Sequence, residues 1–553
     1  MKSNRYFMML ALLVIVAPQL VFGTALDDYV KKPDASYKYS LVNTIEGKGY
    51  TAYVIDMTSQ SWRNKKEVDR TLWKHWLTII KPDKIKSDMG LLWINGGSNN
   101  NDAPKNADFM MVQIALGSGT VVADLKMVPN QPLNFPDGGR PRYEDAIIAY
   151  TFDKCLTTGD QTWPLLLPMV KSAVRAMDTV QNYLASDAGG PVKVKKFLVS
   201  GASKRGWTTW LTAAVDKRVA AIGPAVIDVL NMKESMRHHF SAYGFYAPAI
   251  QDYQEMKIFD RLGTAEGEAM RKLIDPYEYR DRYTMPKFLI SSTGDQFFLP
   301  DSAQFYYDDL PGDKYLRYIP NTDHGLDFSA AASLLLFYKS ILNDSPLPEF
   351  TWKVTGDKIR IKPISGKLKE VNLWQASNEK TRDFRVDTIG RVWKSSPLEP
   401  RDNGRYVARV AKPEKGWTAF FVEMVYDSGD AVTHKFTTQV HVVPQRLPFA
   451  GKVKADKAGL DKISISLTYR GASAADVEKN VINRIEKALA TVGGIKSVKS
   501  MATYGAGTII ILVSESADAT KVLKDIKAKI KSTITLPKQV QKMKMSIVGR
   551  PDA

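Results

Sequence analysis

Ser203 has the surroundings that point most directly to chemistry. It follows the apolar segment Lys196–Ser200 in a Gly-Ala-Ser sequence, and a helix is expected to begin directly after it. A serine on such a sharp strand-to-helix turn is lifted above a sheet and can act as a nucleophile. Gly201 is small enough to let neighbouring backbone approach closely. The usual second glycine, two positions after the serine, is replaced by Arg205, and Gly206 comes one position later.

Two further residues fall where a serine nucleophile would need them. Asp295 follows the apolar strand Pro286–Ser292, and His324 follows the strand Tyr315–Ile319. A histidine must take the serine proton, and a carboxylate must fix the tautomer of that histidine. The order Ser203, Asp295, His324, each at the end of its own strand, is the order of an α/β-hydrolase. The other histidines lie before the central strands, in an insert or in a later β-rich region: His75, His238, His239, His434 and His441.

An oxyanion hole requires backbone N–H groups that point at the developing negative charge. Lys204, directly after the nucleophile, would supply one of them. The second is expected from the loop after an early strand, where Gly97 or Ser98 follows an apolar segment. The alternative is that this segment forms an ordinary glycine turn.

Glu144 and Asp145 are adjacent acids at the expected start of a helix. Acids at that position favour the positive end of the helix dipole, which is a purely structural explanation. The functional alternative is a carboxylate pair that holds the amino group of a substrate, as an aminopeptidase needs. Arg205 is a further candidate for substrate binding.

The elements that must position these residues alternate between strands and helices from about Tyr39 to Leu342. The strand candidates are mostly continuous apolar runs, which is typical of strands covered on both faces: Thr51–Asp56, Leu91–Asn95, Gly119–Asp124, Lys196–Ser200, Val219–Ile227, Phe288–Ser292 and Tyr315–Ile319. Apolar residues at helical spacing lie between them, as in the segment from Val170 to Leu184. The pattern predicts an α/β fold with a doubly wound, mostly parallel sheet, assigned to residues 24–345. An insert at about 231–283, rich in Tyr, Phe and Met, is expected to cap the site.

Two smaller domains are predicted after the sheet. Residues 346–448 show short strands without helices, which indicates a β-sandwich. Residues 451–553 show the order β-α-β-β-α-β, a ferredoxin-like arrangement, and contain 19 Lys/Arg against 9 Asp/Glu, a net charge of +10.

Composition and the first residues bound the possible functions. The chain has 553 residues, 44% of them hydrophobic, and a net charge of +18. One cysteine, Cys155, excludes an intramolecular disulfide framework and a zinc site of several thiolates. Residues 1–23 contain Lys2 and Arg5, an apolar run and small residues near Gly23, which predicts a cleaved signal peptide and a secreted or periplasmic protein. A membrane anchor is the alternative, but the run is shorter than the ~20 residues of a spanning helix.

Several motifs resemble the PhoPQ-activated pathogenicity-related protein family, which includes secreted autocrine proliferation repressor proteins. They occur in order over about residues 25–445: Leu91–Gly97, Arg142–Tyr150, Val199–Trp207, Val226–Asn231 and Asn321–His324. The resemblance implies an exported α/β-hydrolase similar in architecture to prolyl-type serine peptidases, and the family shares the Ser-Lys-Arg-Gly sequence at the turn. That turn is also similar to the one in glucuronoyl esterases. There a basic residue helps to hold the oxyanion, a role that Lys204 or Arg205 could take.

The C-terminal segment resembles a porter subdomain of resistance-nodulation-division efflux pumps. The similarity lies in Ser464–Glu478 and Gly493–Val498 and covers about residues 455–550, without membrane helices. It implies a docking or self-association module for a protein partner rather than transport.

These observations predict an exported serine hydrolase that transfers the acyl group of a peptide or ester. The alternatives are a non-catalytic secreted binding or signalling protein on the same scaffold, and a carbohydrate esterase. The basic C-terminal segment is expected to contact an anionic surface, lipid or polysaccharide. It lacks interleaved aromatic residues, which disfavours nucleic acid as a partner. No metal and no cofactor are expected.

Overall fold

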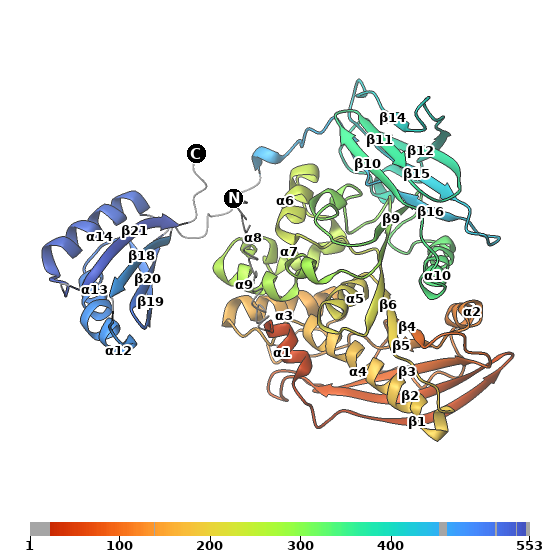
Figure 1. Cartoon of the computed structure of the whole chain (residues 1–553), viewed down its shortest axis with the longest axis horizontal. Helices are drawn as coiled ribbons and strands as arrows, with labels where there is room; N and C mark the ends of the chain where they lie inside the picture. The colour runs from red at the N-terminus through yellow and green to blue at the C-terminus, as the bar shows by residue number, and fades with distance from the viewer. Residues whose placement is uncertain are drawn as a thin grey trace, which may run out of the picture. The chain divides into compact units, whose positions relative to one another are not determined.

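The computed structural model describes residues 23–137, 139–452, 462–469, 471–514, 517–537 and 539–548 (Figure 1). All of the predicted signal peptide except Gly23 lies outside these residues. Within the described residues, no helix combines the length and the apolar character needed to cross a membrane. Contacts divide the chain into two compact units. The first runs to Ser235 and continues through 246–256 and 270–446, and the second comprises 236–245, 257–269 and the chain from Leu447.

The centre of the first unit is a parallel sheet in the order β5-β4-β6-β7-β8-β9. Its strands are β4 Met89–Ile94, β5 Val122–Leu125, β6 Lys196–Ala202, β7 Val219–Ala225, β8 Lys287–Ser292 and β9 Lys314–Ile319. Nearly all of their side chains are buried, because helices cover both faces. Three antiparallel strands extend the sheet beyond β5: β1 Lys38–Gly47, β2 Tyr50–Ser61 and β3 Leu72–Pro82. The predicted α/β-hydrolase fold class is confirmed.

Helices pack on both faces of this sheet (Figure 1). One face holds α2 (Phe109–Ser118) and α10 (Phe328–Leu342), which contact each other. The other holds α4 (Leu166–Ala185) and α5 (Lys204–Val215), also in mutual contact. The unit further contains α1 Ala25–Lys31, α3 Glu144–Thr158, α7 Gln251–Glu255 and α11 Val386–Ile389. Helix α1 begins at a capping box in which the Thr24 and Asp27 side chains each bond the backbone of the other.

The β-rich region after α10 is a sandwich that shares the main sheet. The strands β12 Leu368–Asn378, β13 Lys394–Pro397, β15 Trp417–Tyr426, β16 His434–Thr437 and β17 His441–Val443 continue that sheet. The junction is the pairing of Thr437 with Leu316 of β9. Facing them is a separate three-stranded sheet of β10 Phe350–Thr355, β11 Lys358–Pro363 and β14 Tyr406–Arg409. The boundary expected at residue 346 therefore lies between two parts of one unit. The sandwich covers what would otherwise be the open edge of β9.

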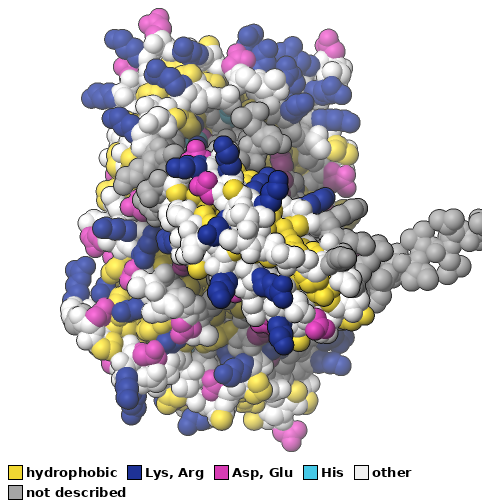
Figure 2. Space-filling view, turned by 90° about the vertical axis from the view of Figure 1, so that its left-hand side faces the viewer, with side chains coloured by type: hydrophobic (Ala, Val, Ile, Leu, Met, Phe, Trp, Pro, Cys, Tyr) yellow, Lys and Arg dark blue, Asp and Glu magenta, His cyan; other side chains and the backbone are white. Residues whose placement is uncertain are grey.

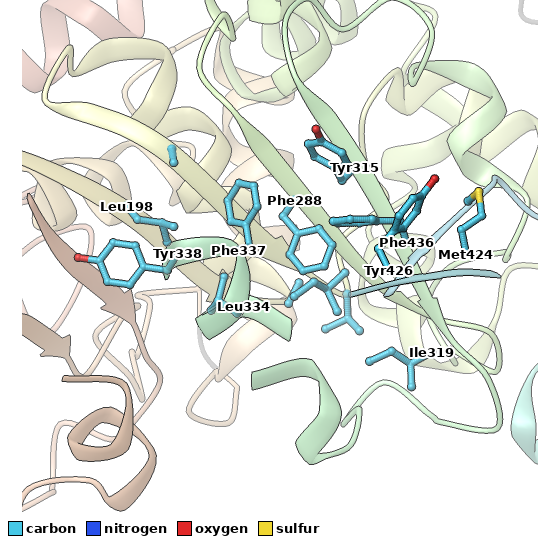
Figure 3. Packing of buried hydrophobic residues seen from close by; sticks show 14 of the residues in the cluster. Leu198, Phe288, Tyr315, Ile319, Leu334, Phe337, Tyr338, Met424, Tyr426 and Phe436 are labelled. Carbon is cyan, nitrogen blue, oxygen red and sulfur yellow. The ribbon is translucent and has the colours of Figure 1, made fainter. Parts of the chain in front are cut away.

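One hydrophobic core runs from the α10 face of the sheet into the sandwich (Figure 3). The Phe288 ring stacks on Phe337 at a centroid distance of 5.3 Å. The Tyr315 ring packs against Phe436 of β16 at 4.6 Å. The strands β8 and β9, which precede Asp295 and His324 in the chain, thus share one packed interior with the sandwich.

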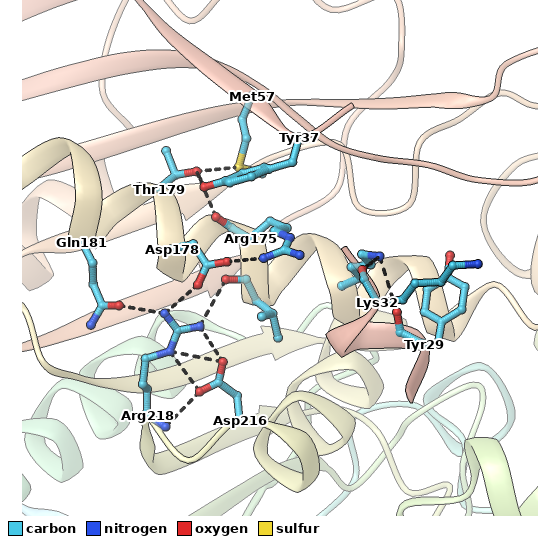
Figure 4. A network of polar contacts seen from close by, with 12 residues as sticks. Tyr29, Lys32, Tyr37, Met57, Arg175, Asp178, Thr179, Gln181, Asp216 and Arg218 are labelled. Atoms are coloured by element: carbon cyan, nitrogen blue, oxygen red, sulfur yellow. Dashed lines mark hydrogen bonds and ion pairs between the residues drawn. The ribbon is translucent and has the colours of Figure 1, made fainter. Parts of the chain in front are cut away.

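A polar network fixes α4 to the opposite side of the sheet (Figure 4). The guanidinium of Arg218, just before β7, donates to Asp216 and contacts Asp178 of α4 at 2.8 Å. Asp178 also accepts a hydrogen bond from Arg175 at 2.7 Å. The Tyr37 hydroxyl lies 3.0 Å from that of Thr179 and ties the start of the chain to the same helix.

The insert between β7 and β8 is helical and is divided between the two units. Its longer helices are α6 Met232–Tyr243 and α9 Ala265–Ile274, with the short α8 Ile258–Arg261 between them. Within the second unit, the Phe449 amide donates to the Ser241 carbonyl of α6 at 2.9 Å. The second unit therefore includes part of the predicted cap in addition to the C-terminal segment.

The C-terminal segment has the predicted ferredoxin-like topology. Its elements are β18 Lys462–Tyr469, α12 Ala474–Val477, α13 Asn483–Leu489, β19 Ile495–Thr503, β20 Ala506–Val513, α14 Ala519–Thr533 and β21 Val540–Val548, with the strand order β19-β20-β18-β21. The Ser473 side chain caps α12, as its position in the sequence predicts. This segment has a hydrophobic core of its own, which includes Ile465, Ile511 and Ile526. Lys and Arg side chains are scattered widely over the face shown in Figure 2, in keeping with the net charge of +18.

Candidate active site

Ser203 occupies a strained turn between β6 and α5. Its backbone has φ 58° and ψ −128°, a conformation that L-residues rarely adopt. The Ser203 amide donates to the Ala225 carbonyl at 2.9 Å, and the Ser203 carbonyl accepts from the Trp207 amide at 3.0 Å. The side chain does not cap the helix. The turn therefore presents a serine whose hydroxyl has no capping role.

Two glycines make this turn possible. A Cβ on Gly201 would lie 2.9 Å from the Arg205 backbone, and a Cβ on Gly206 would lie 2.7 Å from Ile227 and 3.0 Å from the Gly201 carbonyl. Gly206 thus allows the helix and the strand to pack closely, although it lies one position later than the second glycine of the usual motif. This packing accounts for a glycine at position 206 instead of 205.

Asp295 and His324 are hydrogen-bonded to each other. Nδ1 of His324 lies 3.0 and 2.9 Å from the two carboxylate oxygens of Asp295, which is 5% exposed. The backbone amide of Phe297 donates to the same carboxylate at 2.8 Å, and the Phe297 ring packs on the imidazole at a centroid distance of 4.1 Å. Nε2 of His324 is buried and has no hydrogen-bond partner among the described residues. The imidazole is therefore oriented by one nitrogen and free at the other.

The loop after β4 has a distinct set of contacts. Gly97 has φ 136°, a value that strongly favours glycine. The Ser98 amide donates to Oδ1 of Asn101 at 2.5 Å, and the Gly96 amide donates to Oδ1 of Asn95 at 2.8 Å. Of the two residues predicted to supply a donor, Ser98 therefore already has its amide engaged.

Lys204 and Arg205 pair with the two acids at the start of α3. Nζ of Lys204 lies 2.9 Å from Glu144 and 2.9 Å from Asp145. The Arg205 guanidinium lies 2.5 Å from the other oxygen of Glu144. Burial alone would raise the pKa of Glu144, but the adjacent Lys204 and Arg205 outweigh it and lower that pKa to about 2. The cluster contains two acids and two bases, so its charges balance.

The same cluster connects the two loops from which the oxyanion donors are predicted. The Gln131 side-chain amide donates to Glu144 at 2.6 Å and to the Gly97 carbonyl at 3.0 Å. Nε of Arg205 donates to the Val128 carbonyl at 2.6 Å. The Gly97 loop and the first turn of α5 are therefore connected through a partly buried charge cluster.

The chain is similar to known proteins over most of its length. Residues 26–385 match the family model described as PhoPQ-activated pathogenicity-related protein. Over 471 residues the chain is 38% identical to autocrine proliferation repressor protein A of Dictyostelium discoideum, covering 80% of this chain and 94% of that protein. The chain belongs to the PhoPQ-activated pathogenicity-related protein family. The resemblance inferred from the sequence motifs is confirmed.

Residues 458–553 of this family member match the AcrB/AcrD/AcrF family, in agreement with the porter-like sequence of the C-terminal segment. Solved structures similar to it include acetyl xylan esterase 1 from Thermoanaerobacterium, with 16% identity, a TM-score of 0.41 and coverage of 57% of this chain and 91% of that one. The glucuronoyl esterase from Solibacter usitatus has 14% identity, a TM-score of 0.33 and coverage of 57% and 91%.

Three groups near the site of this family member were not found by sequence reasoning. The Tyr253 hydroxyl, from the insert, donates to Asp145 at 2.8 Å. Asp228 at the end of β7 is buried, accepts a hydrogen bond from the Tyr306 hydroxyl and lines one small cavity together with Asp295. Burial raises the pKa of Asp228 to about 7. Asp228 lies inside the segment Val226–Asn231 that carries the family resemblance, but nothing in its spacing indicates this contact.

The third group is the segment around α11, which holds the loops of both Asp295 and His324. The Val386 amide donates to the Gly294 carbonyl at 3.0 Å. The Gln296 side chain donates to Asp387 at 3.3 Å and accepts from the His324 amide at 3.0 Å. Among the residues that the structure describes, no three His, Cys, Asp or Glu side chains group in a way that could hold a metal ion.

Proposed function

We propose that this protein is an exported serine hydrolase in which Ser203 is the nucleophile, His324 the general base and Asp295 the residue that orients the histidine. The observation that supports this assignment best is the paired Asp295 and His324, which leaves a buried and unpartnered Nε2. A histidine base must offer one nitrogen to the nucleophile while a carboxylate fixes the other. The strained turn at Ser203 adds the geometry of a nucleophile elbow.

The reaction follows from these roles. The Ser203 hydroxyl attacks the carbonyl carbon of the substrate while Nε2 of His324 takes its proton. The tetrahedral intermediate collapses when His324 returns that proton to the leaving oxygen or nitrogen. Water then enters, gives a proton to His324 and releases the acid from Ser203 in the reverse order of steps.

The oxyanion donors in this proposal are the backbone amides of Lys204 and Gly97. Lys204 is the first residue of α5, and the first N–H groups of a helix have no partner within the helix. Gly97 is preferred over Ser98, whose amide is engaged by Asn101. The Lys204 side chain is 8% exposed and paired with Glu144 and Asp145, so its backbone rather than its ammonium group would face the substrate.

The balanced charge cluster favours an ester over a free amino terminus as the substrate. Glu144 and Asp145 could bind an amino group only by giving up contacts of 2.9 Å with Lys204. Replacing buried ion pairs in this way costs free energy, because one partner is left uncompensated. Glu144, Asp145 and Arg205 are therefore assigned to positioning of the site, and an ester is preferred over a peptide that is bound by its free amino terminus.

The second candidate is a non-catalytic secreted signalling or binding protein. It is favoured by the name of the 38% identical relative, a proliferation repressor. The basic C-terminal segment is proposed to contact an anionic lipid or polysaccharide surface or a protein partner, in either case outside the cell or in the periplasm.

Labelling with a fluorophosphonate probe separates the two candidates. We expect the mature protein to be labelled and Ser203→Ala to lose labelling completely, while Ser345→Ala, which removes an exposed hydroxyl elsewhere, is labelled like wild type. Asp295→Asn should still be labelled, but at a rate lower by about 10³-fold or more. Without the carboxylate, His324 is no longer held in the tautomer that can accept the serine proton. Equal labelling of wild type and Ser203→Ala would eliminate the nucleophile assignment. The absence of any labelling of folded wild-type protein would favour the non-catalytic candidate.

A further inference from the structure

A groove of about 920 Å³ lies at one end of the sandwich, on the first unit. It is bordered by the end of β12, the residues after α11, the end of β14 and Thr418 of β15. Its volume is within the range of ligand-binding clefts.

The groove is strongly basic. Its charged lining residues are Lys380, Arg391, Lys394, Arg409 and a single acid, Glu379. Lys380 and Lys394 are exposed and, in the described part of the chain, have no acidic partner.

Each of the two arginines has one acidic partner. Arg391 lies 3.2 Å from Asp323 and its side chain is 58% exposed, while Arg409 lies 2.9 Å from Asp357 and is 67% exposed. Exposed pairs of this kind contribute little stability, so an incoming anion can compete for them. The groove therefore offers four cations to a ligand.

Uncharged lining residues narrow the class of ligand. Exposed Gln375, Ser377 and Thr388 supply amide and hydroxyl groups, and Ile389, Val392, Val410 and two alanines supply apolar surface between them, with Val392 42% exposed. Cations and polar groups beside small apolar side chains suit a ligand that carries both hydroxyl groups and carboxylates. We infer that this groove binds an acidic saccharide through Lys380, Lys394 and the two arginines.

The groove is linked to the candidate active site. The Arg391 guanidinium donates to the Asn321 carbonyl as well as contacting Asp323, and both residues belong to the Asn321–His324 segment. A saccharide in the groove would therefore contact the loop that positions the proposed base. Binding itself needs no catalysis and stands independently of the proposed function.

The test measures binding by calorimetry on the full-length mature protein carrying Ser203→Ala, so that no ester is cleaved. The probe is hexagalacturonate, compared with its fully methyl-esterified form, which is neutral, and with hexaglutamate, which has the same charge on a peptide. We expect hexagalacturonate to bind most tightly and its affinity to fall with added salt. Double charge reversal, Lys380→Glu with Lys394→Glu, should weaken binding by about tenfold or more.

The matched control reverses Lys65 and Lys84, two exposed lysines of the same unit outside the groove, and should change affinity by less than about twofold. An equal loss in both double variants would mean diffuse attraction by net charge and would overturn the proposal. Equal affinity for hexaglutamate would refute the saccharide class, and equal affinity for the methyl ester would refute recognition by charge. No measurable binding of hexagalacturonate at low salt would also overturn the proposal.

Discussion

Replacing Glu144 by glutamine tests whether the charge cluster holds the candidate active site in place. The carboxylate contacts Lys204 and Arg205 and accepts from Gln131. The neutral amide keeps the shape of the side chain but leaves the Arg205 cation without a carboxylate. Lys204 would retain only Asp145.

The expected loss of stability follows from the pKa of Glu144, which lies at about 2 instead of the usual 4.5. A displacement of that size corresponds to about 3 kcal/mol, because one pH unit equals 1.36 kcal/mol. The side chain is 35% exposed, so solvent screens part of the interaction and we expect about 1–2 kcal/mol. Because the folded-state pKa is lowered, this contribution is fully present above pH 4.5 and is lost as the pH falls toward 2.

The loss of stability in Glu144→Gln is measured by urea unfolding of the first unit at neutral pH, with tryptophan fluorescence as the signal. Glu370→Gln, a substitution of an exposed glutamate on β12, is the control and should leave the midpoint unchanged. Turnover of a small ester should fall about tenfold in Glu144→Gln, because the Gly97 loop and the first turn of α5 are no longer held together. Wild-type stability and turnover in Glu144→Gln would refute the role of the cluster.

Two other predictions concern different parts of the chain. Burial raises the pKa of Asp228 to about 7, so the folded protein keeps a proton there that the unfolded chain releases near pH 4, and stability should fall as the pH rises between these values. Asp228→Asn should flatten this part of the stability curve in urea titrations, and an unchanged slope would contradict the assignment. Ending the chain after Lys452 retains the Phe449 contact with α6 and removes 18 Lys/Arg and 9 Asp/Glu, including the exposed Lys521, Lys524, Lys527 and Lys531 of α14. The truncated protein should then leave anionic vesicles at a lower salt concentration, while its turnover of a small ester stays within about twofold of wild type. A collapse of turnover in folded protein would show that the C-terminal segment contributes to the active site.

The residues of the site that could be predicted from sequence are those that directly follow the end of one strand. Ser203, Asp295 and His324 each follow an apolar strand, and parallel strands bring their carboxyl ends to one edge of a sheet. The pairing of Asp295 with His324 is therefore expected from the order of the motifs alone. The packing of Gly201 against Arg205 is equally local, whereas Gly206 also packs against Ile227, which follows the next strand.

Contacts between residues far apart in the chain could not be predicted in this way. The pairing of Thr437 with Leu316, which joins the sandwich to the main sheet, depends on one bridge across about 120 residues. Glu144 and Asp145 are ordinary first-turn acids by sequence, and their pairing with Lys204 depends on how α3 lies beside α5. Asp228 could not be recognised because burial, rather than residue type, determines its pKa.

The position of α11 in the chain has a consequence for synthesis. The segment that holds the Asp295 and His324 loops begins at Val386, some 180 residues after Ser203. Chains emerge from the ribosome amino end first, at about 5–20 residues per second, so the serine turn can form well before its partners are locked. In the proposed mechanism, a nascent or truncated chain ending before Val386 can form the serine turn but lacks the segment that holds the loops of Asp295 and His324. In the proposed mechanism, hydrolytic activity therefore arises late in folding, after the segment that begins at Val386 has been synthesised.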